Sequence, residues 1–327
     1  MNLSSTTREP ESRAALPVFD ERPMESVAPP QGWLGGGSWK AQLLTALVLV
    51  WVGLLVILPT VSLVFEALGE GPARLYKSLT HPDVLASFRL TLVATLAATT
   101  LNTVFGLMIA LTLARQSFVG RGLADALLDL PFAVSPVIAG LLLILLYGPM
   151  TPVGGWLDGL GIGVIYHPLG LVIATAFVTL PFVAREVVPV LREFGIDQEE
   201  VAHTLGAGRW TTFRRITLPS IRWGLAYGVL LTIARGLGEF GAVLVVSGNI
   251  LGRTQTTTLY IHDAVETFNP QGAAAASLVL GGVSVGLLLT LEALRERVER
   301  RECHAATTAA TKGESSTTAT NGREPRS

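Results

Sequence analysis

Residues 43–65 read LLTALVLVWVGLLVILPTVSLVF, and this stretch contains no charged side chain. An α-helix needs roughly 20 apolar residues to cross the hydrocarbon core of a bilayer. The stretch meets that length, so it predicts a membrane-spanning helix. The composition agrees, because 50% of the residues are hydrophobic, 15% are charged and the mean hydropathy is +0.50. These values are typical of an integral membrane protein and exclude an ordinary soluble one.

Five more apolar runs follow along the chain, at residues 90–114, 127–147, 169–191, 225–246 and 273–294. Two of them are irregular. The run at 127–147 holds Asp129 and two prolines, and the run at 169–191 is interrupted by Pro181, Arg185 and Glu186. Because proline bends or ends a helix, we expect these two spans to be kinked, tilted or to start later. The sequence predicts an all-α membrane protein with six transmembrane helices.

Basic residues are distributed unequally between the connecting segments. Cytoplasmic segments of membrane proteins are enriched in Lys and Arg. The two termini and the loop between the fourth and fifth spans carry most of the basic residues, whereas the segments on the opposite side carry only Arg74, Lys77, Arg89 and Arg253. The charge pattern therefore predicts that both termini and that loop are cytoplasmic.

Polar tails flank the apolar region. Residues 1–40 are rich in Pro, Ser and Glu, and residues 296–327 are rich in Ala, Thr, Ser and Glu, so we predict two disordered cytoplasmic tails. Between them, residues 41–84 hold the first span and an external loop, and residues 85–295 hold the main transmembrane domain. The first apolar run is too long for a signal-peptide core, so we expect it to remain as a span. Because Cys303 is the single cysteine, no disulfide can form within the chain.

Several functional classes have no support in the sequence. No Gly-Lys pair occurs, so a glycine-rich phosphate loop is absent, and the five histidines lack metal-ligand spacing. The basic residues are not interleaved with aromatic ones, as they are in many nucleic-acid-binding proteins. We predict that the chain is not an enzyme, that it binds no cofactor or metal, and that it binds no nucleic acid. If ATP drives it, a separate chain must bind the ATP and its Mg²⁺.

The predicted cytoplasmic loop at 197–219 has the features of a docking element. Its residues 197–200, DQEE, supply an N-cap and an acidic first helical turn, and Gly206 permits a turn. A second, basic helix is expected from Arg209 to Leu218, with Pro219 ending it. From these features alone, the hairpin either anchors at the membrane surface or docks onto another protein.

The same loop resembles the EAA signature of permease subunits of binding-protein-dependent ABC importers. The matching positions, at the spacing of that signature, are Glu200, Ala202, Gly206, Ile216, Leu218 and Pro219. Val201 departs from the Glu-Ala-Ala form of the signature, where a small apolar residue stands at this position. The resemblance covers residues 85–295 and implies the type I importer (MetI-like) architecture in a bacterial-type inner membrane. It also implies that this loop couples to the ATPase, and that the partners are a second permease, two ATP-binding subunits and an extracytoplasmic binding protein.

Two further stretches resemble the sulfate and molybdate group of these permeases: 128–137, LDLPFAVSPV, and 234–243, ARGLGEFGAV. The residues that follow, VSGNI at 246–250 and GRTQT at 252–256, are most similar to the CysW-type subunits of sulfate/thiosulfate importers. This resemblance implies a sulfate-binding protein as partner and sulfate or thiosulfate as cargo. Molybdate or tungstate is the alternative cargo. A secondary anion transporter that works without ATP is the alternative of a different class, for which no inverted repeat is visible.

Arg235 and Glu239 lie four residues apart in the fifth run and so share one helix face. Charges at membrane depth are costly and face a bundle interior, a water-filled cavity or a partner. Either Arg235 lines the path of a dianion and Glu239 positions it, or the two only neutralise each other. Ser247 is a further candidate for the path. Asp129 is expected to be structural, and Gly224 and Gly228 are spaced for close helix packing.

Overall fold

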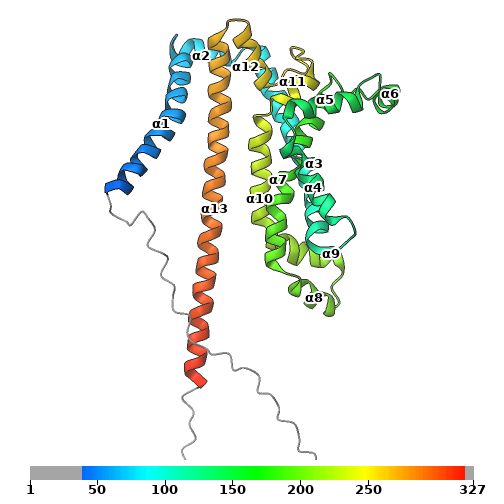
Figure 1. Ribbon diagram of the computed structural model, residues 1–327, viewed down its shortest axis with the longest axis vertical. Helices are drawn as coiled ribbons and strands as arrows, with labels where there is room; N and C mark the ends of the chain where they lie inside the picture. Colours follow the sequence, from blue (N-terminus) through cyan, green and yellow to red (C-terminus); the bar gives the residue numbers. More distant parts are fainter. Residues whose placement is uncertain (1–38, 321–327) are drawn as a thin grey trace, which may run out of the picture. The chain divides into compact units, whose positions relative to one another are not determined.

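The computed structural model describes residues 39–320, and every regular element in that range is helical (Figure 1). Residues 1–38, nearly all of the predicted N-terminal tail, lie outside it. The elements are α1 (Trp39–Leu68), α2 (Pro72–Leu79), α3 (Pro82–Arg115), α4 (Arg121–Ala133), α5 (Pro136–Tyr147), α6 (Pro152–Gly159), α7 (Pro168–Phe194), α8 (Asp197–Thr204), α9 (Arg209–Thr212), the π-helix η1 (Phe213–Thr217), α10 (Leu218–Leu237), α11 (Gly241–Ser247), α12 (Thr257–Glu266) and α13 (Pro270–Thr320).

Five helices are long and apolar enough to cross a membrane, and the pair α4 and α5 makes a sixth if it counts as one span. The two helices of this pair are bent by 112°. The break falls at Ser135 and Pro136, where a residue before proline prefers an extended backbone. The expected distortion of the third span is therefore confirmed. In the fourth span, α7 is a single helix that begins at Pro168 and continues through Pro181 and Pro189.

Two boundaries differ from the prediction. The fifth span, expected to reach residue 246, ends at Leu237, and residues 241–247 form the separate helix α11. Gly236 and Gly238 weaken the helix there, and the charged Glu239 follows them. At the C-terminus, the predicted irregular tail from residue 296 instead continues α13 to Thr320. The preceding span supplies the helical nucleus, so the segment continues an existing helix and does not have to start a new one.

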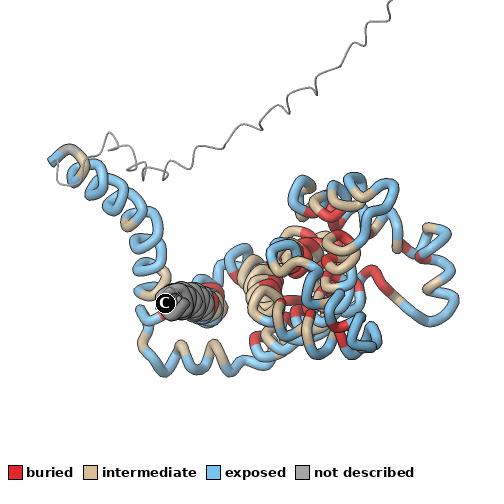
Figure 2. Tube along the Cα trace, turned by 90° about the horizontal axis from the view of Figure 1, so that it is seen from below, coloured by how far each residue is buried: buried red, intermediate tan, exposed pale blue. Residues whose placement is uncertain are grey.

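The chain divides into two compact units, residues 1–60 and 61–327. In the first unit, α1 exposes nearly all of its apolar side chains (Figure 2). Since no water-soluble protein tolerates such a surface, this helix suits lipid or a membrane partner.

In the second unit, α3, α7 and α10 pack against one another along most of their lengths. One core cluster, centred on Leu113, Leu191 and Ile221, joins these three helices to α4. A second joins α5, α7 and α11. A methyl group added at Gly228 would lie 3.1 Å from the backbone of Val183, so the predicted close packing at this glycine is confirmed. The bundle therefore holds α10 tightly along α7.

Candidate coupling loop and translocation path

The helix α8 ends in a glycine turn, as the sequence predicts. Gly206 has φ +83°, in the left-handed region that glycine adopts without strain. Its N–H donates to the carbonyl of His203 at 3.0 Å, and the N–H of Ala207 donates to the carbonyl of Ala202 at 2.9 Å. Together these bonds form a Schellman motif, which satisfies the last carbonyls of α8. The turn fixes the direction in which the chain leaves α8.

The second half of the loop differs from expectation. Pro219 does not end a helix, because α9, η1 and α10 follow one another without a break. The backbone N–H of Leu218 donates to Phe213, five residues earlier, in the wide turn of a π-helix. Pro219 follows directly after this wide turn as the second residue of α10, and an irregular turn of this kind is typical where a proline lies within a continuous helix. The loop is thus a direct extension of a membrane-spanning helix.

An apolar groove lies on the loop. It has a volume of about 360 Å³ and is lined by Asp197, Gln198, Val201, Ala202, Leu205 and Ile216. Apolar side chains on the loop are unusually exposed: Leu205, which lines the groove, is 82% accessible, and Trp210 of α9 is 71% accessible. Of the six predicted coupling residues, Ala202 and Ile216 line the groove, and Glu200 is exposed on α8 beside it. The loop therefore has an exposed, concave apolar surface.

Glu199, which the sequence reasoning treated only as part of an acidic turn, fastens this loop to the bundle. Its Oε1 lies 3.0 Å from Nη2 of Arg115, at the end of α3, and accepts a hydrogen bond of 2.8 Å from the hydroxyl of Thr217. Nη1 of Arg115 also donates to the carbonyl of Leu191 in α7, at 3.0 Å. Both charged side chains are largely buried, 16% and 18% exposed. Only a three-dimensional contact reveals this pairing, because 84 residues separate its members.

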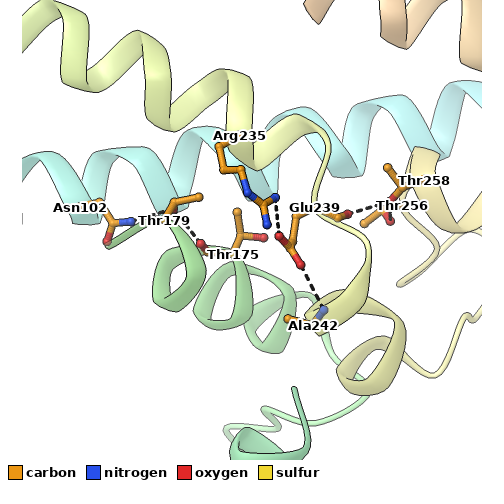
Figure 3. A network of polar contacts seen from close by, with 8 residues as sticks. All are labelled: Asn102, Thr175, Thr179, Arg235, Glu239, Ala242, Thr256 and Thr258. Carbon is orange, nitrogen blue, oxygen red and sulfur yellow. Dashed lines mark hydrogen bonds and ion pairs between the residues drawn. The ribbon is translucent and has the colours of Figure 1, made fainter. Parts of the chain in front are cut away.

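Arg235 and Glu239 form the expected pair at the far end of α10 (Figure 3). Nη1 of Arg235 lies 2.7 Å from Oε2 of Glu239, and the side chains are 34% and 1% exposed. The other carboxylate oxygen of Glu239 accepts a hydrogen bond of 3.1 Å from the N–H of Ala242, in the first turn of α11. A negative charge is favourable at that position of a helix. Glu239 is thus held on both sides, while Arg235 is the accessible member.

Hydroxyl groups surround this pair. Thr258 of α12 donates to the carbonyl of Glu239 at 2.8 Å, and Asn102 of α3 donates to the hydroxyl of Thr179 in α7 at 2.8 Å (Figure 3). Further buried polar residues on α3 repeat at helical spacing and face the same bundle: Ser87, Thr91, Thr95 and Thr99. The interior beside α3 therefore carries a row of polar groups from Ser87 to Asn102, whereas its other end, around Leu113, is apolar.

Ser247, the remaining path candidate, is fully buried within the chain. Its hydroxyl accepts a hydrogen bond of 2.8 Å from the N–H of Asn249, and its carbonyl accepts one of 2.7 Å from the hydroxyl of Thr254. These contacts shape the loop after α11. Ser247 can therefore affect a translocation path only through the shape of this loop and not by touching the substrate.

Asp129 makes a structural contact, as expected, but its partner is Arg185 of α7, which the sequence does not indicate. Nε and Nη2 of Arg185 lie 2.7 and 2.6 Å from its two oxygens, and Nη1 lies 2.9 Å from Asp125. This two-point contact ties α4 to α7. Among the side chains that the structure describes, no group of three His, Cys, Asp or Glu is placed to hold a metal ion.

A second hollow, of about 430 Å³, lies at the opposite end of the bundle from α8 (Figure 1). It is half polar, and its lining includes Arg74, Lys77 and Tyr260. Burial raises the pKa of Tyr260, and the charges of Asp83 and Asp263 raise that pKa further. The tyrosine is therefore a neutral hydrogen-bonding group at physiological pH.

Residues 102–302 match the family described as binding-protein-dependent transport system inner membrane component. The chain is 47% identical over 255 residues to the sulfate transport system permease protein CysW of Synechocystis sp., covering 78% of this chain and 92% of that one. It is 42% identical to CysW of Escherichia coli over 259 residues, 78% of this chain and 89% of the other. It is 41% identical to the permease CysT of the same species over 253 residues, covering 77% and 91%.

Among solved structures, the chain is similar to a bacterial ABC transporter that imports the acidic polysaccharide alginate. The TM-score is 0.64 with 18% identity, over 79% of this chain and 96% of that one. This likeness concerns the fold and agrees with the predicted importer architecture. The family match covers more than half of the chain, and several relatives exceed 40% identity over three quarters of it. The chain belongs to the binding-protein-dependent transport system inner membrane components.

Proposed function

We propose that the chain is a CysW-type permease subunit of an ATP-driven sulfate or thiosulfate importer. Relatives named CysW and CysT, both described as sulfate transport permeases, match most of the chain. The observation that carries the coupling half of the proposal is the apolar groove on the loop that resembles the EAA signature. A protein without a phosphate loop of its own needs such a surface to receive work from an ATPase.

The groove suits an apolar ridge on a separate ATP-binding subunit. Leu205 lines the groove and Trp210 is exposed on the same loop, and both would be covered in the complex, as the buried anchors of protein interfaces usually are. Glu200 and Gly206 contribute to docking in different ways. Glu200 places an exposed negative charge on α8, and Gly206 forms the turn that ends α8. ATP and Mg²⁺ bind on the partner, and this chain holds no cofactor.

The importer needs further partners. A CysT-type permease is the natural second subunit, because the chain resembles both types to a similar degree. Two ATP-binding subunits and an extracytoplasmic sulfate-binding protein complete the assembly. A solved alginate importer is described in complex with its substrate-bound periplasmic protein, which supports that arrangement. The hollow that includes Arg74 and Lys77 lies on the side that would face the binding protein.

We place both chain termini and the coupling loop in the cytoplasm, in a bacterial inner membrane. Arg115 ends α3 and contacts Glu199 of α8, and Arg192 lies in the last turn of α7, directly before α8. Figure 1 shows α8 and α9 together at one end of the bundle. The gathering of these basic residues at one end supports the orientation expected from the distribution of positive charge.

Arg235 is the residue proposed to meet the anion. It is a third exposed, whereas its partner Glu239 is almost fully buried and held by α11 as well. One guanidinium nitrogen contacts Glu239, so the remaining N–H groups are available to sulfate oxygens. The adjacent carboxylate keeps binding weak, and weak binding suits a path that must release its cargo.

A screen of anions tests the choice of cargo. The purified complex with its binding protein is given sulfate, thiosulfate, molybdate or tungstate, and ATP hydrolysis is measured. We expect sulfate and thiosulfate to stimulate hydrolysis and the two metal oxyanions to leave it near the basal rate. Stimulation by molybdate or tungstate alone would assign the chain to the molybdate permeases instead.

A further inference from the structure

The ion pair between Arg115 and Glu199 joins four elements at a single point. Glu199 lies in the first turn of α8, Arg115 ends α3, and Thr217 precedes α10. Arg115 also bonds the carbonyl of Leu191, in the last turn of α7. We propose that this clasp, defined as Arg115, Glu199, Thr217 and the Leu191 carbonyl, transmits movement of the coupling helix to the membrane helices. The inference rests on the proposed function and adds a positioning residue, Glu199, to it.

Each bond in the clasp satisfies a group that otherwise lacks a partner. The last four carbonyls of a helix have no intrahelical donor, and Leu191 carries one of them in α7. Arg115 fills that need. The carboxylate of Glu199 stands at the N-terminus of α8, where the helix dipole favours a negative charge. The clasp is therefore a stable part of the fold rather than a chance contact of surface side chains.

Burial makes the clasp stiff. Its charged side chains are only 16% and 18% exposed, so water screens their attraction much less than at an open surface. Removing one partner would leave the other charge buried without compensation. Movement of α8 away from α3 and α10 is consequently unfavourable, and the four elements are expected to move together.

The core directly beside the clasp continues the same connection. Leu191 belongs to the cluster that also contains Leu113 of α3 and Ile221 of α10. Close-packed side chains transmit displacement because the interior has few voids to absorb it. A pull on α8 thus reaches the inner end of α10 through Glu199 and Thr217, and α10 carries it toward Arg235. Glu200, which matches the EAA signature, is exposed and makes no comparable tie to the bundle.

The test uses the complete importer in proteoliposomes and measures sulfate imported per ATP hydrolysed. For Glu199→Gln and Arg115→Gln we expect this ratio to fall about fivefold or more, the lower end of usual coupling factors between sites. The amount of ATPase subunit bound to the complex should stay unchanged. The double variant should lose no more than either single one, because both remove the same connection.

If the Glu199→Gln complex assembles poorly, variants of Thr217 test the clasp with less disturbance of the fold. Thr217→Val preserves the shape of the side chain and removes its hydroxyl, and should lower the ratio with the complex intact, whereas Thr217→Ser should restore it. The matched control is Glu193→Gln, which changes an exposed carboxylate at the end of α7. It should behave like the unaltered complex.

Three outcomes separate the inference from the function it rests on. Normal coupling in both Glu199→Gln and Arg115→Gln would overturn the clasp and leave the importer standing. Loss of ATPase binding in Glu199→Gln would place Glu199 in the docking surface itself and would also overturn it. Failure of the unaltered chain to bind any ATPase would instead contradict the proposed function.

Discussion

Two Arg–Glu pairs stand near the opposite ends of α10 and differ in what they connect. At the inner end, Arg115 and Glu199 lie 3.0 Å apart, are both mostly buried and come from elements 84 residues apart. At the outer end, Arg235 and Glu239 lie 2.7 Å apart, four residues apart in sequence, and only the carboxylate is fully buried. The first pair ties separate elements together, whereas the second leaves an arginine accessible.

This difference in accessibility indicates that the two ion pairs have different roles. An accessible cation with free N–H groups can meet a passing anion, whereas a cation whose donors reach two other elements cannot do so without breaking the fold. We therefore propose that the inner pair, beside α8, serves coupling and that the outer pair, beside α11, serves the path. Each prediction below changes one side of this contrast.

The largest effect is expected from Glu239→Ala. The change removes the counter-ion of Arg235 and the acceptor of the Ala242 N–H, and a buried donor left without an acceptor costs about 1–3 kcal/mol. Thermal unfolding of the purified complex should show a strong loss of stability. Glu239→Gln retains an acceptor for Ala242 and is expected to be milder. Equal, small losses in both variants would show that Glu239 carries little of the outer structure.

Gly206→Pro acts on the inner side, ahead of the clasp. Proline removes the N–H that donates to His203 and cannot adopt φ +83°. We expect the chain to stay in the membrane and its binding of the ATPase to fall roughly tenfold or more, a loss of about 1.4 kcal/mol. Co-purification of the ATPase measures this.

The control for that change is Gly206→Asn, because asparagine tolerates the left-handed region. It should keep most of the ATPase binding. Charge reversal by Glu200→Lys should weaken binding as Gly206→Pro does, through the rim of the groove. Full co-purification with both Gly206→Pro and Glu200→Lys would remove this loop from the docking surface.

Arg235→Ala tests the outer side. It leaves the buried carboxylate of Glu239 without its counter-ion, so the amount of assembled complex is measured together with uptake of labelled sulfate, and uptake per assembled complex should fall several-fold. Arg235→Lys keeps the charge but loses the forked donor and should be intermediate. Unchanged uptake in Arg235→Ala would mean that the pair serves only to neutralise itself.

The smallest effect is expected from Arg115→Lys. A lysine at this position can reach Glu199 or the carbonyl of Leu191, but its single ammonium cannot span both as the guanidinium does. We expect a loss of about 1 kcal/mol in stability, the usual net value of one hydrogen bond, and a slight fall in coupling. An effect as large as that of Arg115→Gln would show that geometry, and not charge, dominates the clasp.

Much of this architecture could be predicted from sequence because membrane spans and charge asymmetry are local patterns. The apolar runs located all six candidate spans, and the permease family expected from the EAA-like loop is confirmed. The turn at Gly206 was predictable for the same reason, since one residue type suits its backbone.

The errors came where neighbours outweigh local preference. Pro219 was expected to end a helix, but the π-helix before it lets α10 begin there. The clasp was missed because nothing in the sequence around Glu199 indicates Arg115. Three-dimensional packing alone brings those two residues together.

The claim that a separate ATPase drives this chain is tested most directly by uptake of labelled sulfate into proteoliposomes. Two preparations are compared, one with the complete importer and one with this chain and its partner permease but no ATPase subunit. We expect uptake only in the first, and only with ATP on the ATPase side and the loaded binding protein on the other. Sulfate uptake by the second preparation, without ATP, would contradict the account and indicate a secondary transporter.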